Sequence, residues 1–291
     1  MNKDQVTEFV SHPLFISFVI WIIIVISLPP LFSKYRIKTI SSEYIPEKTS
    51  YLYSDLDSDG NSEKISFDFT DAAQTKIIIS RDEKVSDQFN IRHQPANLNS
   101  VYIGNYNNDK FRECFIFTVS EDSIFLNIID PLGLQKIILP DRFIDFRVKT
   151  IKSFDKPEIV PVNIIHNGSQ YGDLVFFITS GFGKKPRSVY RYIIEKDSLV
   201  KSTESSVAIN GCTIIVPDVN NTPEFVLNVS ATGNYDETAP FSDQFTWLMI
   251  LNRDLQFIFD PVKLSKYPSR AVVLPARSDG VQNLILFNEY F

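Results

Sequence analysis

The stretch SDLDSDGNSEKISF, residues 54–67, joins an acidic loop to the beginning of an apolar strand. Alternate Asp residues place carboxylates on one side of a tight turn, and Gly60 permits the positive φ angle that the turn needs. Hard oxygen ligands at this spacing favour Ca²⁺ over any softer metal. The candidate calcium ligands are Asp55, Asp57, Asp59, Glu63 and the backbone carbonyl of Asn61. The same residues also suit a solvated turn in which Asp side chains accept hydrogen bonds from their own backbone.

The combination of a polar loop and an apolar strand recurs along the chain. We call the last loop residue before each strand the anchor; the anchors are Glu63, Glu113, Asp173, Glu224 and Asn283. They recur every 50 to 60 residues, and the later four lead into expected strands at 114–118, 174–179, 225–229 and 284–287. Self-similarity at such a period is typical of repeat architectures. The second loop is a weaker calcium candidate, with the ligands Asn105, Asn107, Asp109 and Glu113.

The pattern Asp-x-Asp-x-Asp-Gly-x-x-Glu at residues 55–63, followed by an apolar strand, resembles the FG-GAP/VCBS repeat of integrin-α-type β-propellers. In that family each repeat is one four-stranded blade and an intact loop binds Ca²⁺, so the resemblance implies a structural calcium site. It covers about residues 50–291, although the third, fourth and fifth loops lose most charged ligands. The stretches SIFLNIID at 123–130 and GFGKKPRSVYRY at 181–192 are similar to propeller-type ectodomains of bacterial membrane-bound sensor kinases.

Short apolar runs separated by turn residues predict an antiparallel meander in each unit. In the first unit the expected strands are 51–53, 65–70, 75–80 and 85–90. Later hairpins are expected between 124–129 and 134–139, between 174–179 and 188–194, and between 245–251 and 255–259. The fifth unit has only two strands, 271–274 and 284–287, which would leave an unpaired sheet edge. Either a segment near Ile37 completes that unit, or the chain is the front part of a longer protein.

The fold class predicted from these units is all-β. We expect a β-propeller-like array of four-stranded antiparallel blades, four complete and one partial, after one N-terminal transmembrane helix. The side chains expected between sheets are Ile65, Phe67, Phe115, Phe117, Val175, Phe177, Val226 and Ile285.

An uncharged stretch near the N-terminus, LFISFVIWIIIVISL at residues 14–28, is extended by further apolar residues to Phe32. Such a run of roughly 19 residues approaches the ~20 needed to cross a hydrocarbon core. No small-residue cleavage site follows and no polar face is present, which argues against a removed signal peptide and a core helix. We expect residues 1–34 to be a tip and transmembrane anchor, 35–49 a linker and 50–291 the β-domain.

The membrane orientation follows from two opposing observations. Lys34, Arg36 and Lys38 follow the apolar run and Lys3 precedes it, which favours a cytoplasmic C-terminal side. The Asp-rich loop favours the opposite side, because a cytosol holds little free Ca²⁺. We expect a single-pass membrane protein with its β-domain on the periplasmic or extracellular side.

Charge and motif content exclude several function classes. The net charge is −6 and no Lys/Arg-rich stripe is present to neutralise phosphates, so nucleic acid is not an expected partner. His12, His93 and His166 are not paired with Cys at metal-ligand spacing, and no P-loop, GxGxxG or Gly-x-Ser-x-Gly motif occurs. We therefore expect neither catalytic residues nor an enzymatic activity.

These observations favour a membrane-anchored, non-enzymatic recognition or sensory module, the ectodomain part of a signalling protein. Repeat arrays present broad surfaces built from loops, which suits recognition of an extracellular ligand or protein. The alternatives are a surface adhesion or assembly protein with an integrin-like propeller, and a propeller enzyme acting on polysaccharide. A kinase encoded downstream would favour the sensor, whereas a secretion or cell-wall sorting segment would favour the adhesin.

Overall fold

The computed structural model describes residues 12–32, 49–120, 123–144, 158–166, 168–179, 187–203, 205, 207–216, 222–233, 241–267, 269–274 and 282–288. Contacts divide the chain into two units, Met1–Ile45 and Pro46–Phe291. The expected linker at 35–49 lies outside the described residues except for Thr49.

The first unit contains one helix, α2, which extends over Pro13–Phe32. Within the described part of the chain, no helix combines the length and the apolar character that a membrane crossing requires.

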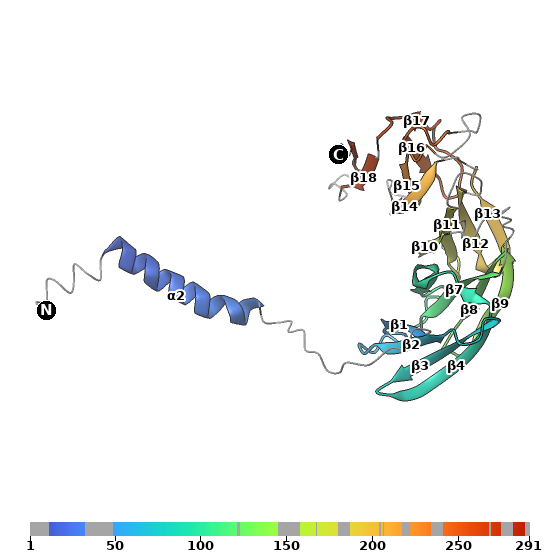
Figure 1. The fold of residues 1–291 in the computed structure, drawn as a ribbon, viewed down its shortest axis with the longest axis horizontal. Helices are drawn as coiled ribbons and strands as arrows, with labels where there is room; N and C mark the ends of the chain where they lie inside the picture. Colours follow the sequence, from blue (N-terminus) through green and yellow to red (C-terminus); the bar gives the residue numbers. More distant parts are fainter. Residues whose placement is uncertain are drawn as a thin grey trace, which may run out of the picture. The chain divides into compact units, whose positions relative to one another are not determined.

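The second unit consists of antiparallel sheets that follow one another in chain order (Figure 1). The first sheet contains β1 (Thr49–Ser54), β2 (Glu63–Asp68), β3 (Gln74–Arg81) and β4 (Lys84–Arg92). The second contains β5 (Gln94–Pro95), β6 (Val101–Gly104), β7 (Glu113–Ser120), β8 (Ser123–Ile129) and β9 (Ile137–Ile144), with the 3-10 turn η1 (Leu98–Ser100) before β6. In that sheet both β5 and β6 pair with β7.

The later sheets repeat the four-stranded meander. The third sheet contains β10 (Glu158–Ile165), β11 (Asp173–Thr179), β12 (Arg187–Ile193) and β13 (Ser198–Lys201), with η2 (Ile194–Lys196) before β13. The fourth contains β14 (Ala208–Ile215), β15 (Glu224–Ser230), β16 (Trp247–Leu251) and β17 (Val262–Lys263). A two-stranded pair follows, β18 (Ser269–Val273) with β19 (Leu284–Asn288).

The anchors occupy one structural position in all four sheets. Glu63, Glu113, Asp173 and Glu224 are the first residues of β2, β7, β11 and β15, and each of these strands lies inside its sheet. Asn283 directly precedes β19. The predicted all-β class, the meander within each unit and the repeat spacing are therefore confirmed.

Three hydrophobic clusters join the sheets in series. The first sheet packs on Cys114 and Ile116 of β7, whereas Phe115 and Phe117 of the same strand face the third sheet. In β11 the same alternation sends Phe176 into the cluster shared with the second sheet and Val175 and Phe177 into the cluster shared with the fourth. Side chains alternate across a strand, so apolar residues at every position let one strand contribute to two cores.

The strand β2 differs because its burial alternates. Ile65 and Phe67 are fully buried, while the alternate residues Lys64, Ser66 and Asp68 are half-buried. This is the pattern of a strand with one face on the core. The first sheet therefore uses one face for the packing against the second sheet.

The expected interior residues are buried with one exception. Ile65, Phe67, Phe115, Phe117, Val175, Phe177 and Val226 are at most 2% exposed. Ile285 was expected to be buried as well, but it is 38% exposed, and its neighbours Leu286 and Phe287 are also exposed. In the described part of the chain β19 pairs only with β18, and no residue of either strand belongs to one of the three hydrophobic clusters.

Two strand limits also differ from expectation. The arm expected at 134–139 begins later, as β9 at Ile137, because Asp130 N–H bonds the carbonyl of Lys136 at 2.9 Å and closes a longer loop. The arm expected at 255–259 forms only an isolated bridge between Leu251 and Phe257, and β17 takes the edge position instead.

Candidate functional site

The first anchor loop connects β1 to β2 and is organised by its own Asp side chains. Asp55 accepts hydrogen bonds from the N–H groups of Asp59 (3.1 Å) and Gly60 (2.9 Å), and Asp59 accepts one from Asn61 N–H at 2.8 Å. Ser58 and Gly60 have positive φ angles of 59° and 91°. Asp side chains that bond nearby N–H groups hold such a turn in place.

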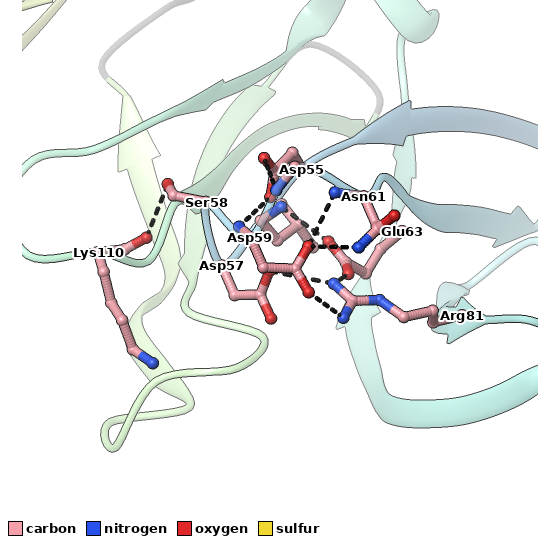
Figure 2. Close-up of polar contacts among 10 residues, drawn as sticks. Asp55, Asp57, Ser58, Asp59, Asn61, Glu63, Arg81 and Lys110 are labelled. Carbon is pink, nitrogen blue, oxygen red and sulfur yellow. Dashed lines mark hydrogen bonds and ion pairs between the residues drawn. The ribbon is translucent and has the colours of Figure 1, made fainter.

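The loop brings acidic groups together at the edge of the first sheet. Ligand atoms of Asp55, Asp57 and Glu63 lie within 4.8 Å of one another. Glu63 is 1% exposed, and its Oε2 accepts the N–H of Leu56 at 2.7 Å. Figure 2 shows the end of the Arg81 side chain reaching the carboxylates of Asp57, Asp59 and Glu63.

The guanidinium of Arg81 lies among the carboxylates. Its Nη2 lies 3.0 Å from Asp57 Oδ1 and also bonds Glu63 Oε1, while its Nη1 lies 2.6 Å from Asp59 Oδ2 (Figure 2). The N–H of Asn61 and this guanidinium together hold the pKa of Asp59 below its ordinary value. A guanidinium with several donors is suited to bridging carboxylates in this way.

Arg81 reaches this position through the strand register. Lys64 pairs with Ser80 between β2 and β3, so the next residues outward, Glu63 and Arg81, lie beside each other. Arg81 was not among the expected site residues, because it lies 18 residues from Glu63 in the sequence. The signal that could have identified it is the short β2–β3 connection, which determines the register once both strands are predicted.

The expected ligands are of the chemical type that binds a hard cation, but the guanidinium of Arg81 already contacts several of them. Asp55, Asp57, Asp59 and Glu63 supply carboxylate oxygens, as a Ca²⁺ site requires. Oxygens of Asp57, Asp59 and Glu63 already bind Arg81, so a metal ion and the guanidinium would compete for the same atoms. For the expected ligand Asn61, the structure shows its N–H and side-chain amide bonding Asp59 Oδ1.

The second anchor loop has a backbone conformation similar to that of the first. Glu113 Oε2 accepts the N–H of Tyr106 at 3.0 Å, as Glu63 does with Leu56. Asn108 has the φ of 59° found at Ser58. Asn105 Oδ1 accepts the N–H groups of Asn107 and Asn108, so it also bonds its own turn, although Asp55 bonds the N–H groups of later residues, Asp59 and Gly60. Asn in place of Asp therefore preserves the turn while removing negative charge.

At the position equivalent to Arg81, the second loop has no positively charged residue. Cys114 pairs with Ile129, so the residue beside the anchor Glu113 is Asp130 rather than an arginine. Glu113 is fully buried, and its Oε1 has no hydrogen-bond partner among the described residues. Burial raises the pKa of Glu113 to about 7, the negative charges of Asp130 and Asp109 add to the effect, and the N–H of Tyr106 opposes it. The pKa of Asp130 is raised by burial as well.

Both loops connect their sheet to the next one. Arg112 N–H, just before the second anchor, bonds the carbonyl of Leu56 in the first loop at 2.8 Å. Gly172 N–H, just before the third anchor, bonds the carbonyl of Tyr106 in the second loop at 2.6 Å. The two bonds join equivalent positions in successive repeats. Pro223, before the fourth anchor, has no N–H, so this bond cannot form there.

The remaining loops are described only in part. Residues 167, 217–221 and 275–281 lie outside the described residues. The third anchor, Asp173, forms an ion pair with Arg191 at 3.7 Å, and Arg191 also lies 3.6 Å from Asp254 in the turn after β16.

The two described loops therefore act as junctions: each holds a turn, buries an acidic anchor and bonds the following sheet. The structure brings together Asp55, Asp57 and Glu63 of the expected ligands, with Asp59 joined to them through Arg81. Comparison with known proteins gives no match for this chain among family models, curated proteins or solved structures.

Proposed function

We propose that this chain is a non-enzymatic recognition module built from propeller-type repeats, with junction loops that fix each sheet on the next. The observation that carries the proposal is the hydrogen bond repeated between equivalent loop positions, Arg112 to Leu56 and Gly172 to Tyr106. A repeated junction of this kind supports a rigid frame whose connecting loops are free to vary. Such frames serve in binding, because loops on a rigid scaffold form broad recognition surfaces.

The propeller-type arrangement is supported by the way in which the sheets pack. Each interior strand that follows an anchor contributes side chains to cores on both of its faces in the second and third sheets. Successive blades of a propeller pack in this face-to-face manner. The acidic anchors support a structural role for the loops, because their carboxylates bond backbone N–H groups of the same turn.

The proposal includes Ca²⁺ as a structural ion at the first loop, held by Asp55, Asp57, Asp59, Glu63 and the carbonyl of Asn61. Binding would require Arg81 to leave the carboxylates, since both cations need the same oxygens. Arg81 is 30% exposed as a side chain and lies at the end of β3, so solvent is within its reach. The free energy needed to displace Arg81 from the carboxylates therefore lowers the affinity of this loop for Ca²⁺.

The calcium proposal is tested by melting the full chain over a titration of Ca²⁺ from chelator to millimolar concentrations. We expect a small rise in Tm for the unchanged chain and a larger rise for Arg81→Gln, which removes the competing charge. Asp57→Ala should abolish the rise, and Asp82→Ala, which removes an exposed carboxylate at the nearby β3–β4 turn, should leave it unchanged. A Tm that does not respond to Ca²⁺ in either the unchanged chain or Arg81→Gln would overturn the site.

The non-enzymatic role is tested separately by incubating the full chain with soluble polysaccharides and assaying new reducing ends. We expect no more product than from a heat-unfolded sample. Turnover that disappears on unfolding would show that a polysaccharide-acting enzyme is the better interpretation.

A further inference from the structure

The strand β19 forms an exposed, apolar sheet edge. It pairs with β18 on one side, and among the described residues no strand lies on its other side. Its sequence, LILFN, carries no charge, and Ile285, Leu286 and Phe287 are all exposed. An apolar edge strand that is open to solvent is a template for pairing with another chain.

The last strands of the four larger sheets differ from β19, because each is protected against such pairing. β4 begins with Lys84 and contains a β-bulge. β9 also contains a bulge, and its Pro140 has no N–H to donate. β13 and β17 have only four and two residues, and they end in Lys201 and Lys263. Bulges, proline, lysine and short length all prevent edge pairing, whereas β19 has five residues, a regular register and neither lysine nor proline.

The free edge of β19 presents the backbone groups of alternate residues. Leu274 N–H bonds the carbonyl of Asn283 at 2.8 Å, which makes these two residues a hydrogen-bonded pair. Hydrogen-bonded and non-hydrogen-bonded pairs alternate along antiparallel strands. Ile285 and Phe287 therefore direct their N–H and C=O groups towards β18, whereas Leu286, between them, directs its N–H and C=O groups towards the free edge.

The β18–β19 pair corresponds to half of a four-stranded sheet. β19 follows the anchor Asn283 as β2, β11 and β15 follow theirs, and each of those strands is the second of four. A second copy joined edge to edge would give the order β18-β19-β19-β18, with β19 again in second position. The pair already packs on the fourth sheet, since β18 contacts β15 and Ala271 N–H bonds Asn228 Oδ1 at 3.2 Å. The sheet formed by two copies would therefore continue the packing of sheet on sheet within each copy.

We propose that two copies of this chain associate by antiparallel pairing of their β19 strands, about a two-fold axis at Leu286. Each Leu286 then exchanges two backbone hydrogen bonds with its equivalent, and Ile285 of one copy lies opposite Phe287 of the other. Cross-strand pairs of a β-branched and an aromatic residue are stabilising, and β19 has no charge that would repel its own copy. A second copy is favoured over an unrelated strand because β19 is complementary to itself in this register. The pairing goes beyond the proposed recognition role, since it determines how the chain assembles.

The first experiment measures the mass of the full chain by sedimentation velocity in a mild non-ionic detergent, which covers the exposed apolar side chains of α2. We expect the unchanged chain to be a dimer. Leu286→Lys and Leu286→Glu each place like charges directly opposite one another and remove apolar contacts, so each should raise the dimer Kd at least about tenfold. An equimolar mixture of the two variants should dimerise again, because opposite charges then face each other.

Ile258→Lys is the matched control. Ile258 is 43% exposed, against 39% for Leu286, and lies between β16 and β17 rather than on β19. The control variant should remain a dimer, since a lysine there lies outside the proposed pairing.

The second experiment tests the register by disulfide formation in Leu286→Cys under mild oxidation. Directly opposite residues of a hydrogen-bonded pair have Cα atoms ~5.5 Å apart, within the range that a disulfide spans. We expect Ile258→Cys to give at least about tenfold less covalent dimer, because its thiols meet only by diffusion. The unchanged chain measures the background from Cys114, which is buried, and Cys212, which is half-buried.

Several outcomes would overturn the pairing. They are a monomeric unchanged chain, an Ile258→Lys variant that is monomeric, a mixture of Leu286→Lys and Leu286→Glu that stays monomeric, and a Leu286→Cys variant that cross-links no more than Ile258→Cys. A monomer in which the new thiol of Leu286→Cys resists maleimide would show instead that another segment of the same chain covers β19.

Circular dichroism and Tm of each variant show whether it is folded. If the charged variants unfold, the cysteine variants alone decide between pairing and its absence. The calcium and turnover tests use no residue of β19, so failure here leaves the proposed function untouched.

Discussion

Two residues in equivalent places give the two junction loops opposite electrostatics. Arg81 lies beside the buried anchor Glu63, and Asp130 lies beside the buried anchor Glu113. In the first loop a guanidinium stabilises the ionised carboxylates, whereas in the second a carboxyl adds further negative charge. Desolvation and a like charge both favour the neutral form of an acid, so Glu113 carries a raised pKa of about 7.

The raised pKa of Glu113 makes stability depend on pH. Its pKa is higher in the folded chain, about 7, than the ordinary value of 4.5, so the folded state holds the proton more tightly. The resulting stabilisation is fully present below pH 4.5 and is lost as the pH rises through 7. At 1.36 kcal/mol per unit this amounts to about 3 kcal/mol.

Glu113→Gln should remove this dependence, because a neutral amide keeps the acceptor for Tyr106 N–H and carries no charge. Urea unfolding in chelator should show Glu113→Gln more stable than the unchanged chain by about 1–3 kcal/mol at pH 8 and nearly equal at pH 5. Glu63→Gln is the matched control and should destabilise at pH 8, since Arg81 loses its most buried partner. Equal effects of the two substitutions at pH 8 would contradict the assignment of opposite roles.

At the scale of elements, the junction loops depend on a close approach of backbone segments. Gly172 N–H bonds the carbonyl of Tyr106 at 2.6 Å, and the rings of Tyr106 and Tyr171 stack at 5.5 Å between centroids. A Cβ at Gly172 would lie 2.4 Å from Ile164 Cγ2 and 3.0 Å from His166 Cε1. A side chain at this position would therefore clash with residues of the third sheet itself, in the segment whose N–H bonds the second loop.

Gly172→Ala should destabilise the chain by about 1–3 kcal/mol, the usual cost of overpacking a tight contact. Gly211→Ala in β14 is the control, because its Cβ would meet only Asn228 at an ordinary 3.4 Å, and we expect a change below about 1 kcal/mol. Thermal unfolding followed by circular dichroism measures both. A Gly172→Ala variant as stable as Gly211→Ala would show that the junction tolerates separation.

At the scale of the whole β-unit, the sheets form a series in which each core joins only neighbours. Three clusters lie between the first and second, second and third, and third and fourth sheets. Stability in such a series is approximately a sum of terms for each sheet and each interface. A change at one junction is therefore expected to act mainly on the two sheets that it joins. The effect of each variant above on stability can then be interpreted separately.

The repeat was accessible from the sequence alone. Anchor positions recur because every unit needs a polar turn before an interior strand, and short alternating runs identify most strands by a local pattern. The clustering of Asp55, Asp57 and Glu63 was accessible for the same reason, since these residues are close in sequence and fold into one turn.

Only the tertiary structure decided which residues of other segments contact the anchor loops and the strands. Arg81 and Asp130 reach the anchors through strand register, which depends on the length of each connection rather than on any local signal. The exposure of Ile285 depends on what packs against β19, and the position of Asp141 depends on a β-bulge in β9. Sequence periodicity encodes which face of a strand is apolar, but not what packs against it.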